Sequence, residues 1–406
     1  MAVFPPVEEQ LKSLMRGAAQ VETTAELRKK LEKSFAADKP LRVKYGIDPT
    51  GFDVHLGHTV PLRKLRQFQD LGHTAVLIMG TATAAVGDPS GRDQSRQGLN
   101  AEQIEKNAQT YLTQIAKVID VTKAEVRPNG EWFSKFGFNE MLRLLGQTTV
   151  QRMIERDDFS NRMKAGTPIY LHECLYPLMQ GWDSVEIKAD VELGGTEQLY
   201  NLMVGRDLQR TEGQEPQICF TMPILRGLDG VKKMGKSLGN YIGLNEVPKE
   251  QFGKTMRIPD ELMSEWFTLL TDRTQEEISQ IVAGHPNEAK KLLASDIVTF
   301  YHGKEAATAT LADWIKQHKE KQDPDNIDEV TIPKEKLTEG AMLAIDLMVE
   351  TKLCASKGEA RRKIDPEKAF NYGPDRTKVT DVKSTVPITD GLVVRLGRKI
   401  LRVRLT

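Results

Sequence analysis

Two short motifs stand far apart in this chain, and each places hydrogen-bonding or cationic side chains beside a glycine. The first is His-Leu-Gly-His at residues 55–58, and the second is Lys-Met-Gly-Lys-Ser at residues 233–237. Imidazole N–H groups and lysine ammonium groups both stabilise negative charge on phosphate oxygens. If both motifs serve one ligand, the fold must bring distant segments together around nucleotide phosphates.

The residues around the first motif predict a βαβ unit. Residues 41–47 alternate like a strand, residues 58–72 have helical spacing that ends at a glycine, and residues 75–80 form a continuous apolar run. Such a unit makes the two strands parallel and places the histidines at a helix N-terminus, which favours anions. Taken without the second motif, the same histidines would be ordinary loop residues.

Ligands of open α/β sheets bind beyond the carboxyl ends of the strands. Asp48 follows the first predicted strand, and Asp88 follows the second, within a glycine-rich stretch. We therefore expect Asp48, His55 and Asp88 to converge at one edge of the sheet.

The second motif has a competing interpretation. Residues 230–237 satisfy the P-loop pattern G-x-x-x-x-G-K-[ST]. A P-loop leaves a strand directly and opens a helix, but here a glycine-bearing turn follows the apolar segment 218–225, and more glycines follow Ser237. We interpret the motif as a flexible loop whose lysines, Lys233 and Lys236, close on a triphosphate.

A third segment carries a polar stripe. In a helix, Tyr176, Gln180 and Asp183 lie at i, i+4 and i+7, on one face of an otherwise apolar stretch. Three such groups can bind a small zwitterion, and the alternative is an internally satisfied hydrogen-bond network. A glycine-rich segment at residues 194–198 follows.

These three segments together resemble the bacterial type of tyrosyl-tRNA synthetase, a class I aminoacyl-tRNA synthetase. The resemblance implies a tyrosine–tRNA ligase, which joins tyrosine and ATP to give tyrosyl-adenylate and pyrophosphate and then transfers tyrosine to the terminal adenosine of tRNA(Tyr). The implied partners are L-tyrosine, ATP with Mg²⁺ as the substrate complex, tRNA(Tyr) and a second copy in a homodimer. No protein-bound metal, prosthetic group, membrane or DNA is expected.

The resemblance also assigns residues to roles. Charge stabilisation during activation falls to His55, His58, Arg92, Arg96, Lys233 and Lys236. ATP binding falls to Asp48, Thr50, Gly57, Gly195, Glu197 and Lys236. The tyrosine pocket comprises Asp88, Tyr176, Gln180, Asp183 and Gln198, with Asp183 accepting the substrate hydroxyl. Phenylalanine would leave that buried carboxylate without its partner, which is costly.

Three positions depart from the family's pattern. Val43 stands where we expect a tyrosine that contacts the substrate hydroxyl, so recognition should depend more on Asp183 or on an unassigned donor. Glu197 replaces the aspartate expected at the ATP ribose, and Gly235 replaces a serine.

The predicted fold class is α/β, in several parts. Residues 1–247 should form a Rossmann-like parallel-sheet catalytic domain, and residues 248–318 a small all-helical domain that contacts the anticodon. Residues 319–340 read as a charged linker. Residues 341–406 should form a C-terminal α+β RNA-binding domain that resembles a module of a small-subunit ribosomal protein. This last part has fourteen Lys and Arg against eight Asp and Glu, and such a surplus suits phosphate contacts.

Composition constrains the location. The 406 residues are 39% hydrophobic and 28% charged, as in soluble proteins, and no apolar run is long enough to span a bilayer. The N-terminus lacks the pattern of a signal peptide. Three scattered cysteines, Cys174, Cys219 and Cys354, indicate a reducing compartment, so we expect the cytoplasm.

Two other functions remain open at this point. One is an RNA-binding protein that has lost the activation step, and the other is a P-loop nucleotide hydrolase. Tyrosine-dependent exchange of pyrophosphate into ATP separates the three, because only the ligase catalyses it.

Overall fold

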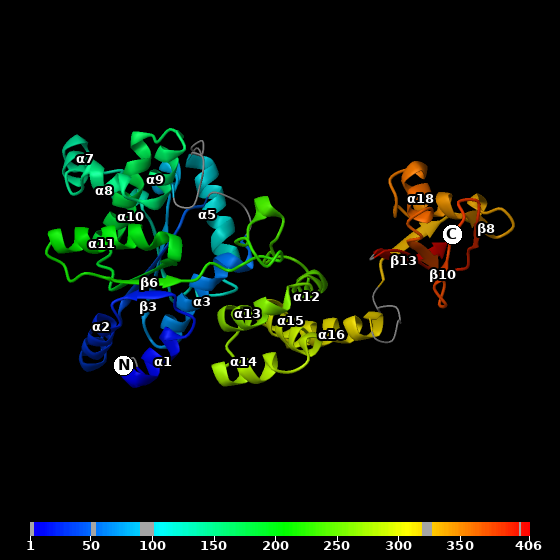
Figure 1. Cartoon of the computed structure of the whole chain (residues 1–406), viewed down its shortest axis with the longest axis horizontal. Helices are drawn as coiled ribbons and strands as arrows, with labels where there is room; N and C mark the ends of the chain where they lie inside the picture. Colours follow the sequence, from blue (N-terminus) through cyan, green and yellow to red (C-terminus); the bar gives the residue numbers. More distant parts are fainter. Residues whose placement is uncertain (1–3, 50–53, 90–100, 319–326, 398) are drawn as a thin grey trace. The chain divides into compact units, whose positions relative to one another are not determined.

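The computed structural model describes residues 4–49, 54–89, 101–318, 327–397 and 399–406. The chain forms two compact units, Met1–Ala307 and Thr308–Thr406 (Figure 1). The predicted site residues Thr50, Arg92 and Arg96 lie outside the described residues. Within those described ranges, we find no helix with the length and apolar character needed to cross a membrane.

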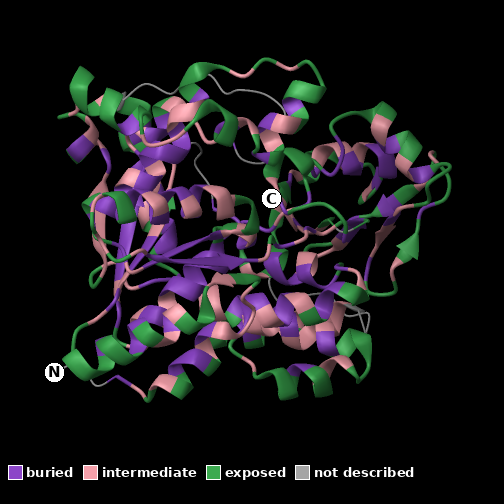
Figure 2. Ribbon diagram, turned by 60° about the vertical axis from the view of Figure 1, so that its left-hand side comes forward, coloured by how far each residue is buried: buried purple, intermediate pink, exposed green. Residues whose placement is uncertain are grey.

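The first unit is built on a six-stranded sheet. Its strands are β1 (Gln20–Glu22), β2 (Arg42–Ile47), β3 (Thr74–Met79), β4 (Glu125–Pro128), β5 (Val191–Gly195) and β6 (Ile218–Met222), in the order β1-β6-β5-β2-β3-β4. All neighbours are parallel except β1, which pairs antiparallel with β6 at the edge. Figure 2 shows the strands buried between helices. The predicted α/β class with a parallel sheet is confirmed.

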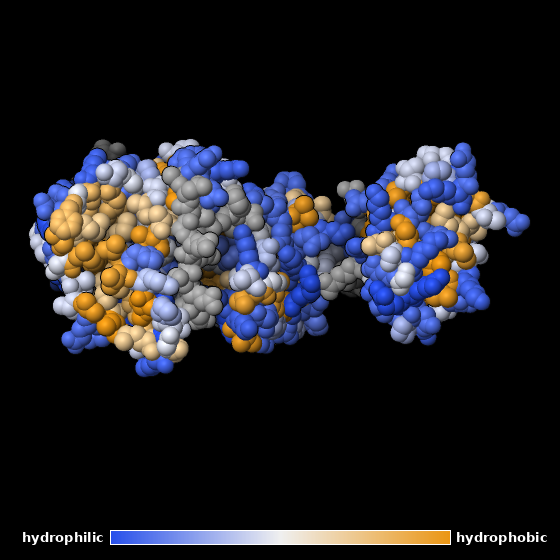
Figure 3. Space-filling view, turned by 90° about the horizontal axis from the view of Figure 1, so that it is seen from above, coloured by the Kyte–Doolittle hydropathy of each residue, from blue (hydrophilic) through white to orange (hydrophobic). Residues whose placement is uncertain are grey.

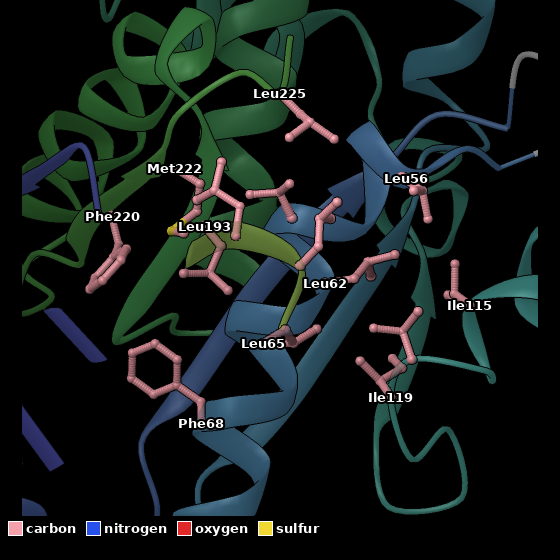
Figure 4. Packing of buried hydrophobic residues seen from close by; sticks show 14 of the residues in the cluster. Leu56, Leu62, Leu65, Phe68, Ile115, Ile119, Leu193, Phe220, Met222 and Leu225 are labelled. Carbon is pink, nitrogen blue, oxygen red and sulfur yellow. The ribbon is translucent and has the colours of Figure 1, made fainter. Parts of the chain in front are cut away.

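One face of the sheet is covered by α3 (Leu56–Asp70), the helix predicted after the first motif. Its residues Leu62, Leu65 and Phe68 are buried against Leu193 and Phe220 of the sheet (Figure 4). Helices α1 (Val7–Met15), α2 (Thr24–Ala37) and α5 (Ala101–Ile115) contribute to the same core. The buried apolar face of α3 therefore sets where the histidines at its N-terminus lie.

The other face carries α10 (Leu175–Glu186) and α11 (Leu199–Thr211), which pack against each other. Smaller elements complete this side: α4 (Thr83–Val86), α6 (Gly130–Phe133), α7 (Phe138–Leu145), α8 (Val150–Ile154), α9 (Asp157–Lys164), η1 (Leu171–Cys174) and η2 (Thr196–Gln198). Alternate residues of β3 serve the two faces, since Ala75 and Leu77 join the α3 core while Val76 and Ile78 pack with Trp132.

The structure is helical over residues 248–318, as the sequence predicts. After η3 (Lys236–Leu238) and α12 (Pro248–Thr255) come η4 (Asp260–Leu262), α13 (Met263–Leu270), α14 (Gln275–Val282), α15 (Pro286–His302) and α16 (Lys304–His318). Trp266 and Phe267 of α13 and Leu293 and Ile297 of α15 belong to the same hydrophobic cluster as α3. This helical segment thus shares its core with the sheet, and the boundary at residue 247 stays a prediction.

The second unit contains a five-stranded sheet in the order β10-β9-β12-β13-β7 and a β11-β8 pair. Its elements are β7 (Glu329–Ile332), η5 (Lys334–Lys336), β8 (Ala341–Leu343), α17 (Ala344–Glu350), α18 (Lys357–Ile364), β9 (Phe370–Tyr372), β10 (Thr377–Lys378), β11 (Thr385–Pro387), β12 (Val393–Leu396) and β13 (Lys399–Leu405). The expected linker is too long, because β7 pairs with β13 and so belongs to this sheet.

One buried histidine generates a prediction about stability. His73 accepts a hydrogen bond at Nδ1 from the backbone N–H of Leu41 (3.2 Å), and its Nε2 lies 2.9 Å from Oε1 of Gln10. Because the Gln10 amide nitrogen donates elsewhere, to the carbonyl of Pro5, Nε2 must carry the ring proton. A second ring proton, at Nδ1, would point at the backbone N–H of Leu41 and break that hydrogen bond. Burial lowers the pKa of His73 to about 4.

We therefore expect the first unit to lose stability as the pH falls from 6.5 to 4.5. In that range His73 is protonated in the unfolded chain but stays neutral in the folded chain. This group alone therefore lowers the free energy of unfolding by about 2 kcal/mol. Urea titrations followed by tryptophan fluorescence measure it. His73→Gln should flatten this pH dependence, while the exposed His172→Gln should not. An unchanged slope in His73→Gln would contradict the assignment.

Candidate active site

The two motifs face one cleft of about 900 Å³ at the carboxyl ends of the parallel strands. Its lining comes from β2, the N-terminus of α3, α10, the end of β5 and the loop after β6. Of the residues singled out by sequence, the lining includes Asp48, His55, Gly57, His58, Asp88, Tyr176, Gln180, Asp183, Gly195, Glu197, Gln198, Lys233 and Gly235. The expected meeting of distant segments is confirmed.

Backbone pairing holds the motifs beside each other. The N–H of Leu56 donates to the carbonyl of Ile242 (3.0 Å), and the N–H of Leu244 donates to the carbonyl of Val54 (2.9 Å). Met234 is buried, and a Cβ on Gly57 would lie 3.4 Å from its Cβ. The segment after the lysine loop is thus joined to the histidine segment by main-chain hydrogen bonds.

This arrangement does not fit a P-loop. Strand β6 ends at Met222, well before the motif, and Ser237 lies in the short 3₁₀ turn η3. Gly239 then adopts φ +65°, which ends the turn. A P-loop needs an α-helix that begins at its lysine and serine, whereas only the three-residue turn η3 begins at Lys236. The structure therefore argues against a P-loop, and the closing of the lysines on a triphosphate stays a prediction.

The two histidines lie at the start of α3, with their rings stacked at 3.7 Å between centroids. His55 is buried, and desolvation lowers its pKa to about 3, with His58 and Lys236 adding repulsion. The pKa of His58 is lowered for the same two reasons, desolvation first and Lys236 second. Both imidazoles are therefore neutral near pH 7, so each offers one N–H donor to an anion at the positive end of α3.

The lysine loop is shaped by an asparagine. The side chain of Asn240 accepts from the N–H of Gly235 (2.9 Å) and donates to the carbonyl of Lys233 (3.1 Å). Lys233 borders the cleft, and Lys236 is close enough to lower the pKa of both histidines. Gly235 has extended backbone, and a Cβ there would meet nothing closer than 3.8 Å. The departure at Gly235 therefore removes a hydroxyl without being required by the backbone.

The polar stripe of α10 faces the cleft as expected. Tyr176 donates its hydroxyl to Oδ2 of Asp48 (2.8 Å), and Thr83 donates to Oδ1 of the same carboxylate (2.8 Å). Gly80 is required at this point, because a Cβ there would lie 1.9 Å from Asp48. These contacts fix Asp48 at the end of β2.

Asp183 lies at the inner end of the stripe and is buried. Its Oδ1 accepts from the indole N–H of Trp132 (3.0 Å), and its Oδ2 accepts from the amide of Asn129 (3.4 Å). Burial raises the pKa of Asp183 to about 7, while the charge of Lys44 and the two hydrogen bonds oppose that rise. The carboxyl group therefore changes its charge near neutral pH and has oriented donors on one side.

The matching of Val43 to the family's hydroxyl-binding tyrosine does not agree with the structure. Val43 is fully buried in the core on the α3 face of the sheet. Its neighbour Lys44 points to the opposite face, where its Nζ contacts Glu192 (2.8 Å) and donates to the carbonyl of Gln180 (2.6 Å). Successive strand residues face opposite sides of a sheet, so Lys44 is the residue beneath the pocket.

The remaining predicted ligand-binding residues lie around the carboxyl end of β5. Gln198 donates to Oδ2 of Asp88 (2.8 Å). The carboxylate of Glu197 folds over Gly195, where a Cβ would lie 2.2 Å from Oε2. The pKa of Glu197 is raised, chiefly by desolvation. A longer side chain than aspartate is thus accommodated because residue 195 is glycine.

Sequence reasoning missed several residues of this site. Trp132 and Asn129 follow the carboxyl end of β4, a position that the rule for ligands of α/β sheets could have indicated. Lys44 was detectable as a charge inside a buried strand pattern. Asn201, which contacts both pocket glutamines, belongs to no motif.

The basic residues of the second unit divide into two groups. Arg361 and Arg362 of α18 are exposed. Arg395 of β12 is buried and donates to the carbonyl of Gly373 (2.8 Å). Arg404 of β13 binds Glu329 (2.7 Å). Part of the basic surplus predicted to contact phosphates therefore has structural partners within the unit.

Comparison with known proteins places the chain among relatives. A family model described as tRNA synthetases class I (W and Y) matches residues 36–319. The tyrosine–tRNA ligase of Symbiobacterium thermophilum is 48% identical over 98% of this chain and 97% of its own length. That of Aquifex aeolicus is 47% identical, with 97% of each chain covered.

A solved structure supports the fold. Tyrosyl-tRNA synthetase from Archaeoglobus fulgidus, complexed with L-tyrosine, is 23% identical, covers 76% of this chain and 100% of its own, and superposes with a TM-score of 0.61. At this level of identity the likeness concerns the fold alone.

Proposed function

The chain belongs to the family of class I tRNA synthetases (W and Y), and we propose that it is a tyrosine–tRNA ligase. It activates tyrosine with ATP and charges tRNA with the product. The observation that carries this function is the single cleft in which the histidine motif, the lysine loop and the polar stripe of α10 meet. We propose that ATP and tyrosine bind side by side there.

In the activation step, negative charge builds on the phosphate oxygens as pyrophosphate leaves. We assign its stabilisation to six residues: His55, His58, Lys233, Lys236, Arg92 and Arg96. The neutral histidines donate N–H groups and the lysines follow the leaving group. Mg²⁺ enters with ATP as part of the substrate. Asp48, Thr50, Gly57, Gly195 and Glu197 complete the proposed ATP site.

The proposed tyrosine pocket extends from Asp88 to Asp183. Asp88, Tyr176, Gln180 and Gln198 surround the ammonium and carboxylate groups, and Asp183 accepts the phenolic hydroxyl. Gly46 lies on the same face of β2 as Lys44, and a Cβ there would meet nothing within 4 Å. This open space beside the end of the strand leaves room for the ligand.

In the transfer step, the cleft must receive the terminal adenosine of tRNA(Tyr). We propose that the helical segment 248–318 contacts the anticodon and that α18, with Arg361 and Arg362 exposed, contacts tRNA phosphates in the second unit. A cytoplasmic location suits these substrates and the three free cysteines.

We further propose a homodimer formed through an apolar face of the first unit. Exposed hydrophobic side chains gather on α7, α8, α9 and η1: Phe138, Leu142, Leu145, Val150, Met163, Tyr170 and Leu171. Leu171 is 89% exposed and Phe138 77%. Figure 3 shows hydrophobic surface over this end of the unit. Contiguous exposed apolar surface marks an interaction site, and a second copy is the partner that the family suggests.

The first prediction concerns Lys236→Ala in pyrophosphate exchange. We expect the rate to fall about 100-fold or more, since one donor to transition-state charge is removed, while tyrosine binding stays within about twofold. Lys232→Ala is the control, because Lys232 is an exposed lysine of the same loop but, unlike Lys236, does not lower the pKa of His55 or His58.

Other outcomes of this assay are decisive. A parallel loss of tyrosine binding would refute the role of the loop. No exchange in the unmutated chain would indicate an RNA binder, and tyrosine-independent ATP turnover a hydrolase.

The second prediction concerns the pH dependence of tyrosine binding. The phenolic hydroxyl donates to ionised Asp183, whose pKa is about 7 in the free enzyme. The dissociation constant for tyrosine should therefore rise about tenfold from pH 8 to pH 6. The binding of phenylalanine should not weaken over the same range, because protonation of Asp183 removes a buried charge that phenylalanine leaves unpaired. Trp132→Phe, which loses a donor to the ionised form, should move the transition to higher pH. Identical pH profiles for both ligands would contradict this role of Asp183.

The third prediction concerns the apolar face. The double variant Phe138→Glu/Leu171→Glu should sediment as a monomer at concentrations where the unmutated chain is a dimer, because two charges cannot be buried between copies without a partner. Phe35→Glu, on α2 and outside this face, should leave the assembly intact. A dimer that persists in the double variant would place the interface elsewhere.

A further inference from the structure

One asparagine contacts both glutamines of the proposed tyrosine pocket. Asn201 lies on α11, is fully buried, and is not among the described residues that line the cleft. Its Nδ2 donates to Oε1 of Gln180 (3.0 Å) and to Oε1 of Gln198 (3.0 Å). A single amide group thus holds the oxygen ends of two side chains that face the ligand.

The opposite ends of both glutamines meet carboxylates. Nε2 of Gln180 donates to Oε1 of Glu192 (3.1 Å), and Nε2 of Gln198 donates to Oδ2 of Asp88 (2.8 Å). If either amide were reversed, its oxygen would face a carboxylate and its NH₂ would face the NH₂ of Asn201. All four contacts therefore favour the same orientation of the two amides.

The orientation of Asn201 is set in turn by a guanidinium. Nη1 of Arg156 donates to Oδ1 of Asn201 (3.0 Å), and since Arg only donates, the asparagine oxygen must point to it. Arg156 is held by both carboxylate oxygens of Asp158 (3.0 Å each) and lies 4.9 Å from the ring centroids of Phe159 and Tyr200. Arg156 thus sets the orientation of the Asn201 amide, and Asn201 in turn sets the orientation of the two glutamine amides.

We propose that Asn201 is a positioning residue for amino-acid binding, because it fixes which ends of Gln180 and Gln198 face the ligand. A zwitterion needs donors for its carboxylate and acceptors for its ammonium group, so the order of donors and acceptors along the cleft determines its affinity. This inference rests on the proposed assignment of the two glutamines to the tyrosine pocket.

The test uses Asn201→Asp in the full chain. The substitution keeps the shape and the contact with Arg156 but replaces the donor with an acceptor, so both glutamines must reverse against Glu192 and Asp88. We expect the dissociation constant for tyrosine to rise at least about tenfold, as for the loss of two hydrogen bonds, while the KM for ATP changes less than about twofold. Asn201→Leu, which removes the donor without adding a charge, should raise the dissociation constant for tyrosine in the same way.

The matched control is Gln209→Glu. Gln209 is another buried amide on α11, but it donates to the carbonyls of Ser184 (3.3 Å) and Ala189 (2.9 Å), away from the cleft. This variant should lower the Tm and leave tyrosine binding unchanged. In a Gln180→Ala/Gln198→Ala background, Asn201→Asp should add little to the loss of tyrosine binding, because its effect acts through those side chains.

The outcomes separate the inference from the assignment beneath it. If Gln180→Ala and Gln198→Ala both bind tyrosine normally, the proposed pocket is wrong. If the two glutamine variants bind tyrosine more weakly but both Asn201 variants bind it normally, only the positioning role of Asn201 is overturned. Equal losses of tyrosine and ATP affinity, together with a Tm lowered as in Gln209→Glu, would make Asn201 a structural residue and also overturn the proposal.

Discussion

A fully buried ion pair lies between two strands of the sheet, and its lysine also bonds to the helix that carries the proposed amino-acid pocket. Lys44 on β2 and Glu192 on β5 are register partners 2.8 Å apart. Lys44 also donates to Ser184 (2.8 Å) and to the carbonyl of Gln180. These hydrogen bonds hold α10 on the sheet in addition to apolar packing, and removing one partner of such a buried pair costs about 3–5 kcal/mol. The pocket depends on that attachment.

The cleft follows from this arrangement. The parallel strands end together, so Asp48, Gly195 and the N-terminus of α3 reach the same edge. On one side, neutral imidazoles and a lysine loop offer positive potential; on the other, an oriented polar network lies under α10. The groups that would bind charge are held by neighbours before any ligand arrives, which lowers the cost of reorganisation during reaction.

Sequence patterns predicted the positions of helices and strands better than they predicted which face of the sheet a side chain lies on. The helix after the histidines and the buried strand β3 both follow from periodicity and glycine positions, which are local properties. The error at Val43 shows the limit. A shift of one residue along a strand exchanges the two faces of the sheet, so the residue under the pocket is Lys44. Asn201 and Trp132 belong to no motif, because Arg156 and Asp183, to which they bond, lie 45 and 51 residues away.

By itself, the sequence determined the chemistry available: two histidines at a helix start, two lysines in a glycine-bearing loop and a polar stripe on an apolar helix. These follow from residue type and spacing along one element. Only the tertiary structure decided which groups are neutral, which way each amide points and which cation lies beneath Asp183. Those properties depend on burial and on partners contributed by other elements, and spacing along the chain does not encode them.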